Sequence, residues 1–274
     1  MENFLQEMAK EKPVRFTTQQ LFSFTNNYST RLGPGGFGSV YKGQFPNGVM
    51  ISVKFPKWSV DRRAEDEQFM AKTGTIGRTY HINLDRLYGF CHDQYMSALV
   101  YEFLENGSLD QYLFKEEKEI EWEKLHEIAI GTARGLAYLH EECPQRIIHY
   151  DIKPGNILLD ENFFPNRDST HATLTGYRGT PGYSAPEFSL INHPITHKCD
   201  VYSFGMVLFE IIGRQRNAIV GSAPCNDSLD WFPKHVWEKN EKDELGAMIV
   251  TCGIEEKDQE KAERMCKVAL WCSV

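Results

Sequence analysis

Residues 147–159, with the sequence IIHYDIKPGNILL, contain three polar side chains whose types and spacing could do chemistry. A carboxylate at Asp151 can orient a hydroxyl group, the ammonium of Lys153 can steady negative charge, and the amide of Asn156 can hold a metal ion. Packing gives no reason for an exposed Asp-x-Lys-x-x-Asn string. The chemistry that such a set would serve is the transfer of a phosphoryl group to a hydroxyl.

A glycine-rich segment, LGPGGFGSV at residues 32–40, could hold the phosphate groups of a nucleotide. Glycine has no side chain to keep a phosphate away from backbone N–H groups, and it adopts positive φ at little cost. Pro34 fixes φ and removes one N–H donor, so we expect it to weaken the contact. The alternative is a glycine-rich hairpin that binds nothing.

The elements that must position these residues change in kind along the chain. Strand patterns run through residues 32–55, 84–90 and 96–103, and one charged helix is expected over residues 61–78. Capping boxes predict two further helix starts, at Thr17 with Gln20 and at Ser108 with Gln111.

Helical periodicity prevails after about residue 105. One face of a long helix collects Leu125, Ile128, Ala129, Thr132, Leu136 and Leu139. Residues 200–212, DVYSFGMVLFEII, are apolar nearly all round, which is typical of a buried central helix. The predicted fold class is therefore α+β, with a strand-rich front part and a helical remainder.

Composition excludes several function classes. The chain has 274 residues and a formal net charge of −8, which argues against a nucleic-acid-binding surface. It has no apolar run of about 18 residues, so no membrane insertion is expected. Its seven cysteines are dispersed without a CxxC pair, which makes disulfide frameworks and metal clusters improbable and favours a reducing compartment, the cytoplasm.

Together the motifs resemble a protein kinase domain, and more narrowly that of plant receptor-like Ser/Thr kinases of the rust-resistance kinase type. The resemblance covers residues 16–272 and includes the strings TIGRTYHINLDRLYGFC, ENGSLDQYLF, GTPGYSAPE and THKCDVYSFGMVLFEIIGR. It implies a two-lobed fold with a juxtamembrane-like extension at 1–27, a small β-rich N-lobe at 28–104 and a larger helical C-lobe at 105–274. The C-lobe is expected to be incomplete, because the chain stops at Trp271-Cys-Ser-Val274 before the last helices of the family.

The resemblance implies ATP-dependent phosphorylation of protein Ser or Thr as the family reaction, with Mg²⁺ as cofactor. Asp151 and Lys153 take the catalytic roles, and Lys153 with Thr180 suits a Ser/Thr rather than a Tyr kinase. The implied metal ligand is Asn156. The residues implied to bind the nucleotide are Gly33, Gly35, Gly38, Val40, Lys54, Glu102, Leu104 and Leu158.

Within that set, Lys54 is expected to grip the α- and β-phosphates, and backbone groups of Glu102 and Leu104 to bind adenine. Ser52 replaces the small apolar Ala that contacts the adenine ring in the family. A hydroxyl left unpaired there would cost about 1–3 kcal/mol.

Departures from the family pattern put the activity in doubt. Lys72 stands where a Glu should pair with Lys54, and two cations about 4 Å apart repel by roughly 1–4 kcal/mol. Tyr150 replaces the Arg before the catalytic Asp, as in "non-RD" kinases. The Mg²⁺-binding Asp-Phe-Gly, expected roughly 18 positions after that Asp, is missing. A deletion of about ten residues after Pro165 would explain this, with Asp168 as a substitute metal ligand.

Three hypotheses remain open. The first is a kinase-fold scaffold or pseudokinase in plant signalling that transfers phosphate weakly or not at all. The second is an active non-RD Ser/Thr kinase with substitute metal ligands, and the third is a truncated or mis-spliced product without function. The expected partners are proteins, either substrates or a receptor kinase, through which alone the chain would associate with a membrane.

Overall fold

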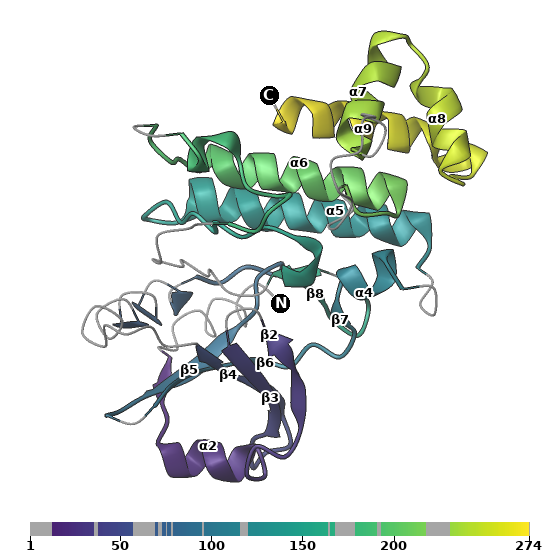
Figure 1. The fold of residues 1–274 in the computed structure, drawn as a ribbon. Helices are drawn as coiled ribbons and strands as arrows, with labels where there is room; N and C mark the ends of the chain where they lie inside the picture. The colour runs from purple at the N-terminus through teal and green to yellow at the C-terminus, as the bar shows by residue number, and fades with distance from the viewer. Residues whose placement is uncertain are drawn as a thin grey trace, which may run out of the picture. The chain divides into compact units, whose positions relative to one another are not determined.

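The computed structural model describes residues 13–35, 38–56, 69–70, 73–74, 76–77, 79–94, 96–115, 120–163, 165–167, 179–190, 193–217 and 231–273, and only the backbone at 34, 35, 166 and 167. The chain divides into two compact units, Met1–Glu105 and Asn106–Val274. The first is rich in strands and the second in helices, as the α+β prediction requires (Figure 1).

The first unit is built on a six-stranded sheet in the order β1-β5-β6-β4-β3-β2. Its elements are β1 (Val14–Arg15), α2 (Thr18–Phe24), β2 (Arg31–Gly35), β3 (Gly38–Gln44), β4 (Met50–Pro56), β5 (Leu87–His92) and β6 (Ser97–Glu102). All neighbouring strands are antiparallel except β1, which pairs with β5 in parallel. The capping box predicted for Thr17 and Gln20 is confirmed at the start of α2.

The two faces of β4 have different roles. Ile51 and Val53 are fully buried in a cluster with Leu21 of α2, which covers this face of the sheet. Because side chains alternate along a strand, Ser52 and Lys54 point to the opposite face. The hydrophobic effect on one face therefore fixes the direction of two polar side chains on the other.

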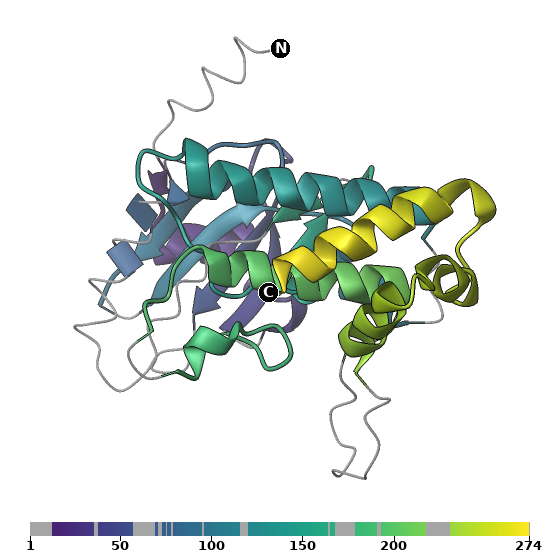
Figure 2. The ribbon, with the colours of Figure 1, turned by 90° about the horizontal axis from the view of Figure 1, so that it is seen from above.

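The second unit consists of helices around a small sheet. Its helices are α4 (Asp110–Leu113), α5 (Trp122–Ala137), α6 (Lys198–Gly213), α7 (Phe232–Glu241), α8 (Leu245–Thr251) and α9 (Gln259–Cys272). Strands β7 (Gly107–Ser108), β8 (Ile157–Leu159) and β9 (Pro165–Arg167) form an antiparallel sheet in the order β7-β8-β9. Helix α6 packs against both α5 and α9, and α9 lies across it (Figure 2).

The helical periodicity predicts this core correctly. Every residue of the predicted α5 face is buried, and α6 is buried nearly all round. The capping box predicted at Ser108 is wrong, because Ser108 pairs in β7 with Leu158 and its hydroxyl donates to Asp110 Oδ1 at 2.5 Å. Most of the helix predicted at 61–78 lies outside the described residues. None of the described helices has the length and hydropathy that a membrane span requires.

Candidate active site

The loop that carries Asp151 is anchored on a buried carboxylate at the start of α6. The backbone N–H of His149 donates to Asp200 Oδ2 at 2.7 Å, and that of Tyr150 donates to Oδ1 at 2.8 Å. His140 Nε2 lies 2.9 Å from the same Oδ2. Tyr150 adopts a left-handed φ of 68°, which these contacts must hold in place because a residue with a Cβ rarely adopts it.

Asp200 keeps its charge although it is completely buried. Burial alone would raise its pKa, but the hydrogen bond with His140, the proximity of His149 and the two backbone N–H donors outweigh this and hold the pKa below its ordinary value. A carboxylate that stays ionised at neutral pH suits this place, because it can accept all of these hydrogen bonds at once.

The residues predicted to be catalytic come together around the Asp151 carboxylate, which is only 3% exposed. Lys153 Nζ lies 2.9 Å from Oδ2, and Asn156 Nδ2 donates to Oδ2 and to the backbone carbonyl of Asp151, both at 2.8 Å. Thr180 Oγ1 donates to Oδ1 at 2.5 Å and accepts from Lys153 Nζ at 2.8 Å. The sequence string therefore forms one connected cluster.

This arrangement can bind a hydroxyl group and take up its proton. Thr180 shows how a hydroxyl group fits here. Its hydroxyl donates to the Asp151 carboxylate, and its oxygen accepts a hydrogen bond from Lys153. A carboxylate within hydrogen-bond reach of a hydroxyl can act as a general base, and a nearby ammonium stabilises the negative charge that develops.

The segment that contains Thr180 is itself held by α6. The backbone N–H of Tyr183 donates to the Thr180 carbonyl at 3.0 Å, and the Tyr183 hydroxyl donates to Glu210 Oε2 at 2.7 Å. Ser203 Oγ donates to the Tyr183 carbonyl at 2.7 Å. Burial raises the pKa of Glu210 above its ordinary value, although hydrogen bonds from Tyr183 and Asn217 act in the opposite direction.

The fit of a Mg²⁺ ion is incomplete in the described residues. Asn156 directs its amide nitrogen to Asp151, which leaves Oδ1 as the oxygen it could offer to a metal. The described part of the chain contains no cluster of three or more His, Cys, Asp or Glu side chains suited to a metal. Mg²⁺ requires near-octahedral oxygen coordination, so a single amide oxygen does not make a site. Asp168, the proposed substitute, lies outside the described residues.

Two of the residues predicted to bind a nucleotide, Val40 and Lys54, lie on the same face of the first unit's sheet. Val40 pairs with Lys54 across β3 and β4, so both side chains share the face opposite the Leu21 cluster. Lys54 is 8% exposed and Leu104 is buried. Leu158 belongs to β8 of the second unit and pairs with Ser108 and Asn166. Lys72, the expected neighbour of Lys54, lies outside the described residues.

The glycines of the 32–40 segment differ in what they require. Gly33 pairs with Val40 and Gly35 with Gly38 across β2 and β3. Gly38 has φ 149°, and a Cβ there would lie 1.8 Å from the Phe55 carbonyl oxygen. A Cβ on Gly33 would meet nothing within 4 Å. Glycine at position 38 is therefore needed for the fold itself, whereas glycine at 33 is not.

The Ser52 hydroxyl has a hydrogen-bond partner, whereas a free-energy cost was expected only for an unpaired hydroxyl at this position. Ser52 Oγ donates to the backbone carbonyl of Glu102 at 3.2 Å. The penalty for an unpaired hydroxyl therefore does not apply in this structure.

The sequence interpretation missed the hydrogen bonds of His140 and of the Tyr183–Glu210 pair. A signal was present for both residues, because the buried Leu136 precedes His140 by four positions and the buried Met206 and Val207 precede Glu210 by four and three positions. A polar residue at such a position is rare unless it has a buried partner.

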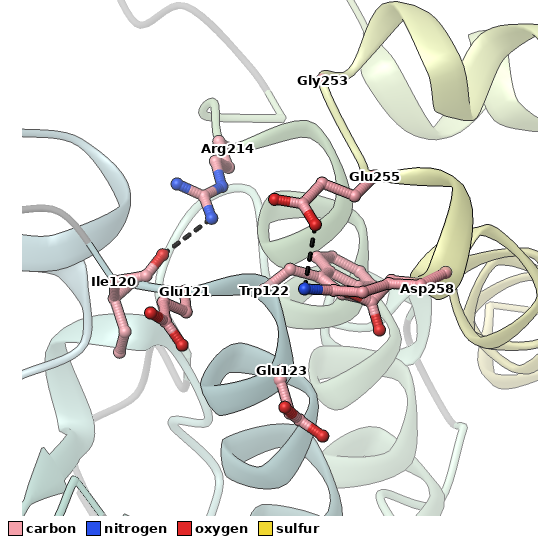
Figure 3. A pocket seen from close by; sticks show the side chains of 9 residues that line it. Ile120, Glu121, Trp122, Glu123, Arg214, Gly253, Glu255 and Asp258 are labelled. Atoms are coloured by element: carbon pink, nitrogen blue, oxygen red, sulfur yellow. Dashed lines mark hydrogen bonds and ion pairs between the residues drawn. The ribbon is translucent and has the colours of Figure 1, made fainter.

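A hollow of about 550 Å³ lies beside the start of α5, away from the Asp151 cluster, and none of the predicted site residues lines it (Figure 3). Its lining is charged, but its cations already have partners. Arg214 Nη2 donates to the Ile120 carbonyl at 2.7 Å, and Lys257 Nζ lies 2.9 Å from Glu255 Oε2. We assign no ligand to it.

Comparison with known proteins gives a consistent result. A family model described as "Protein kinase domain" matches residues 27–221. The chain is 42% identical to Rust resistance kinase Lr10 of Triticum aestivum, over 99% of this chain and 44% of that protein. It is 41% identical to the G-type lectin S-receptor-like serine/threonine-protein kinase SD2-5 of Arabidopsis thaliana, over 99% of this chain and 34% of the relative.

A third relative, the PR5-like receptor kinase of Arabidopsis thaliana, is 39% identical over 94% of this chain and 40% of its own length. The chain thus spans less than half the length of these curated relatives. The matches confirm the family that the motifs predict. Because the family model covers more than half of the chain and the similarity to receptor-like kinases runs along nearly all of it, the chain belongs to the protein kinase family, as a Ser/Thr protein kinase domain of the plant receptor-like kinase type.

Proposed function

We propose that this domain binds ATP but transfers its γ-phosphoryl group to protein Ser or Thr weakly or not at all, and that it serves plant signalling mainly as a scaffold. The observation that carries the proposal is the sequence after β9. Ser169 stands roughly 18 positions after Asp151, where kinases of this family place the Asp that binds Mg²⁺.

Two further observations support a missing segment. The alignment with Rust resistance kinase Lr10 runs over 291 residues, whereas the chain has 274, so that relative has positions without a counterpart here. In the structure β9 pairs with β8 up to Arg167, where Ile157 is its partner. Asn166 and Arg167, which follow the proposed break after Pro165, therefore lie in β9, and no Asp-Phe-Gly stands between Pro165 and Ser169.

The other predicted site residues support two steps of the family reaction, which are the binding of a nucleotide and the activation of a substrate hydroxyl. Lys54 stands on the same sheet face as Val40, and Asp151 is placed to orient a substrate hydroxyl and accept its proton. Lys153 would stabilise charge on the transferred group. ATP supplies the phosphoryl group in this family, and Asn156 is the one described residue that would contribute an oxygen to its Mg²⁺.

One observation favours the second candidate, an active non-RD kinase. The cluster of Asp151, Lys153, Asn156 and Thr180 is fully assembled, although Tyr150 replaces the family's Arg. The third candidate, a product without a stable fold, is disfavoured by the buried cores of both units.

The proposed partners are proteins of a receptor-kinase pathway, and the proposed place of action is the cytoplasm, with membrane association through such a partner. Several relatives are receptor kinases by name, which supports this assignment. The extension at 1–27 and the lobe boundaries at 28–104 and 105–274 also stay proposals.

The test is incorporation of radiolabelled phosphate from ATP with Mg²⁺, by the chain itself and into a generic protein substrate. We expect little label with the wild type and more with Ser169→Asp, which restores a carboxylate at the family position. Asp168→Asn serves as the control for the neighbouring carboxylate. Strong incorporation of label by the wild type that Asp151→Ala abolishes would overturn the proposal of impaired catalysis and favour an active kinase. Loss of label on Asp168→Asn would identify Asp168 as the substitute ligand.

A further inference from the structure

One hydrogen bond links the two backbone regions on which nucleotide binding is proposed to depend. Ser52 Oγ on β4 donates to the carbonyl oxygen of Glu102, at the end of β6, at 3.2 Å. The two residues are 50 positions apart in the sequence. The bond is part-buried, and it uses the side chain that departs from the family's Ala.

The strand register places this hydroxyl on the proposed nucleotide face. Ser52 pairs with Tyr101 of β6 and, on the other side, with Lys42 of β3, while Lys54 pairs with Leu99. Side chains of directly paired residues project from the same face of a sheet, and residues two apart on one strand do so as well. The Ser52 hydroxyl therefore shares its face with the Lys54 ammonium and Val40.

The chemistry of this contact bears on the nucleobase. A 6-aminopurine presents an N–H donor at its amino group. The backbone N–H of Glu102 donates to the Arg86 carbonyl at 3.0 Å, so the Glu102 backbone group that could bind this amino group is the carbonyl. In this chain that oxygen already accepts from Ser52, and the hydroxyl adds an oxygen atom beside it. An amino group entering here must share the acceptor or displace the hydroxyl, and each option removes part of the gain of a hydrogen bond.

We propose that Ser52 is a specificity-determining residue of the nucleotide site: its hydroxyl caps the Glu102 carbonyl and removes the preference for a 6-amino group, so that the site accepts purine nucleotides with and without it. This inference rests on the proposed function, namely that the chain binds nucleotides on this face of the sheet. A purely structural role for the same hydrogen bond is the competing explanation, and it predicts a change in stability alone.

The experiment is calorimetric titration of the full chain with ADP and with purine riboside 5′-diphosphate, which carries hydrogen in place of the 6-amino group. EDTA is present throughout, so that the outcome does not depend on the metal ligands. The variants are Ser52→Ala, which removes the hydroxyl, and Ser52→Cys, which keeps the size but replaces it with a weak donor.

Ser23→Ala is the matched control. Ser23 is exposed on α2, the helix that covers the opposite face of the sheet. Cooperative thermal melting of each variant establishes that it is folded, and Ser52→Cys provides the comparison should Ser52→Ala fail this check.

We expect the wild type and Ser23→Ala each to bind the two nucleotides with similar affinity. Ser52→Ala should bind ADP about three- to tenfold more tightly while the analogue is unaffected, since one hydrogen bond of ordinary strength is gained. Ser52→Cys should shift in the same direction. Unchanged ratios of the two affinities in both Ser52 variants would overturn the inference and leave the proposed function standing. Failure of every folded variant to bind either nucleotide would overturn the proposed nucleotide binding, and the inference with it.

Discussion

Thr180 donates its hydroxyl hydrogen to the carboxylate of Asp151 at 2.5 Å, although the two residues are 29 positions apart. Lys153 Nζ donates to the same Thr180 oxygen at 2.8 Å. The Thr180 side chain thus ties the segment after the break in the kinase pattern to the loop that carries Asp151. The strength of this tie can be measured even if the domain transfers no phosphate.

Thr180→Val keeps the shape of the side chain and removes the hydroxyl. We expect the free energy of unfolding to fall by about 1–3 kcal/mol, because the buried Asp151 carboxylate loses a donor. Urea denaturation provides the measurement. Thr180→Ser is the control and should stay close to the wild type. Equal stability of the Val variant would show that the hydrogen bond contributes nothing to the fold.

Asp200→Asn should be among the most damaging single substitutions in the second unit. An amide accepts on one oxygen only, so its NH₂ group would face a backbone N–H that now donates to Asp200. We expect a loss of about 1–3 kcal/mol in unfolding free energy, the range for leaving a buried hydrogen-bond donor without an acceptor. Asp243→Asn, on an exposed turn, is the matched control. A small loss at 200 would contradict the anchoring role.

The lowered pKa of Asp200 also fixes the sign of a pH effect. Its contribution to stability is complete above the ordinary carboxyl pKa of about 4 and disappears as the pH falls through the lower folded-state value. Stability of the wild type should therefore decline on acidification below about pH 4, and Asp200→Asn should lack this part of the decline. Denaturation curves recorded at several pH values measure the difference.

Because of Glu210, we expect a pH dependence of stability with the opposite sign. Burial raises its folded-state pKa, so the folded chain holds this proton more tightly than the unfolded chain does. Its contribution is complete below the ordinary pKa and is lost as the pH rises through the raised folded value. Glu210→Gln still accepts from Tyr183 and should flatten this part of the pH dependence. Glu238→Gln, an exposed partner of Lys234, should leave the slope unchanged.

Gly38→Ala and Gly33→Ala form a matched pair of substitutions in one hairpin. The first forces a Cβ to within 1.8 Å of the Phe55 carbonyl, whereas the second places it in open space. We expect Gly38→Ala to lower the free energy of unfolding by about 2 kcal/mol or more and Gly33→Ala to change it by less than about 1 kcal/mol. Thermal melting of the two variants measures the difference. Similar effects of the two would show that β3 and β4 can move apart at this end without cost.

The sequence predicted those features of the fold and the candidate site that depend on residues close together in the chain. The buried face of α5 follows from spacing alone, because burial repeats with the helical period. The catalytic string is also local, and six positions hold Asp151, Lys153 and Asn156 together. The role of Ser108 could not be predicted in this way, because its hydroxyl can cap a helix or contact Asp110 at a strand end, and its pairing in β7 decided between the two.

Non-local contacts escaped prediction for a physical reason. His140 and Asp200 are 60 positions apart and meet only when α5 and α6 pack together. The bond from Ser52 to the Glu102 carbonyl depends in the same way on the register of β4 with β6. Sequence patterns state which face of an element is buried, but they do not state which partner a polar group finds there.

The parallel pairing of β1 with β5 has a consequence for how this domain can be produced and kept in solution. Val14 and Arg15 cover the outer edge of β5, and Leu21 on the following helix is fully buried against β4. A chain shortened to begin at residue 28 would expose both an unpaired strand edge and an apolar patch. Such edges recruit other chains, so the shortened protein should self-associate where the longer one stays monodisperse.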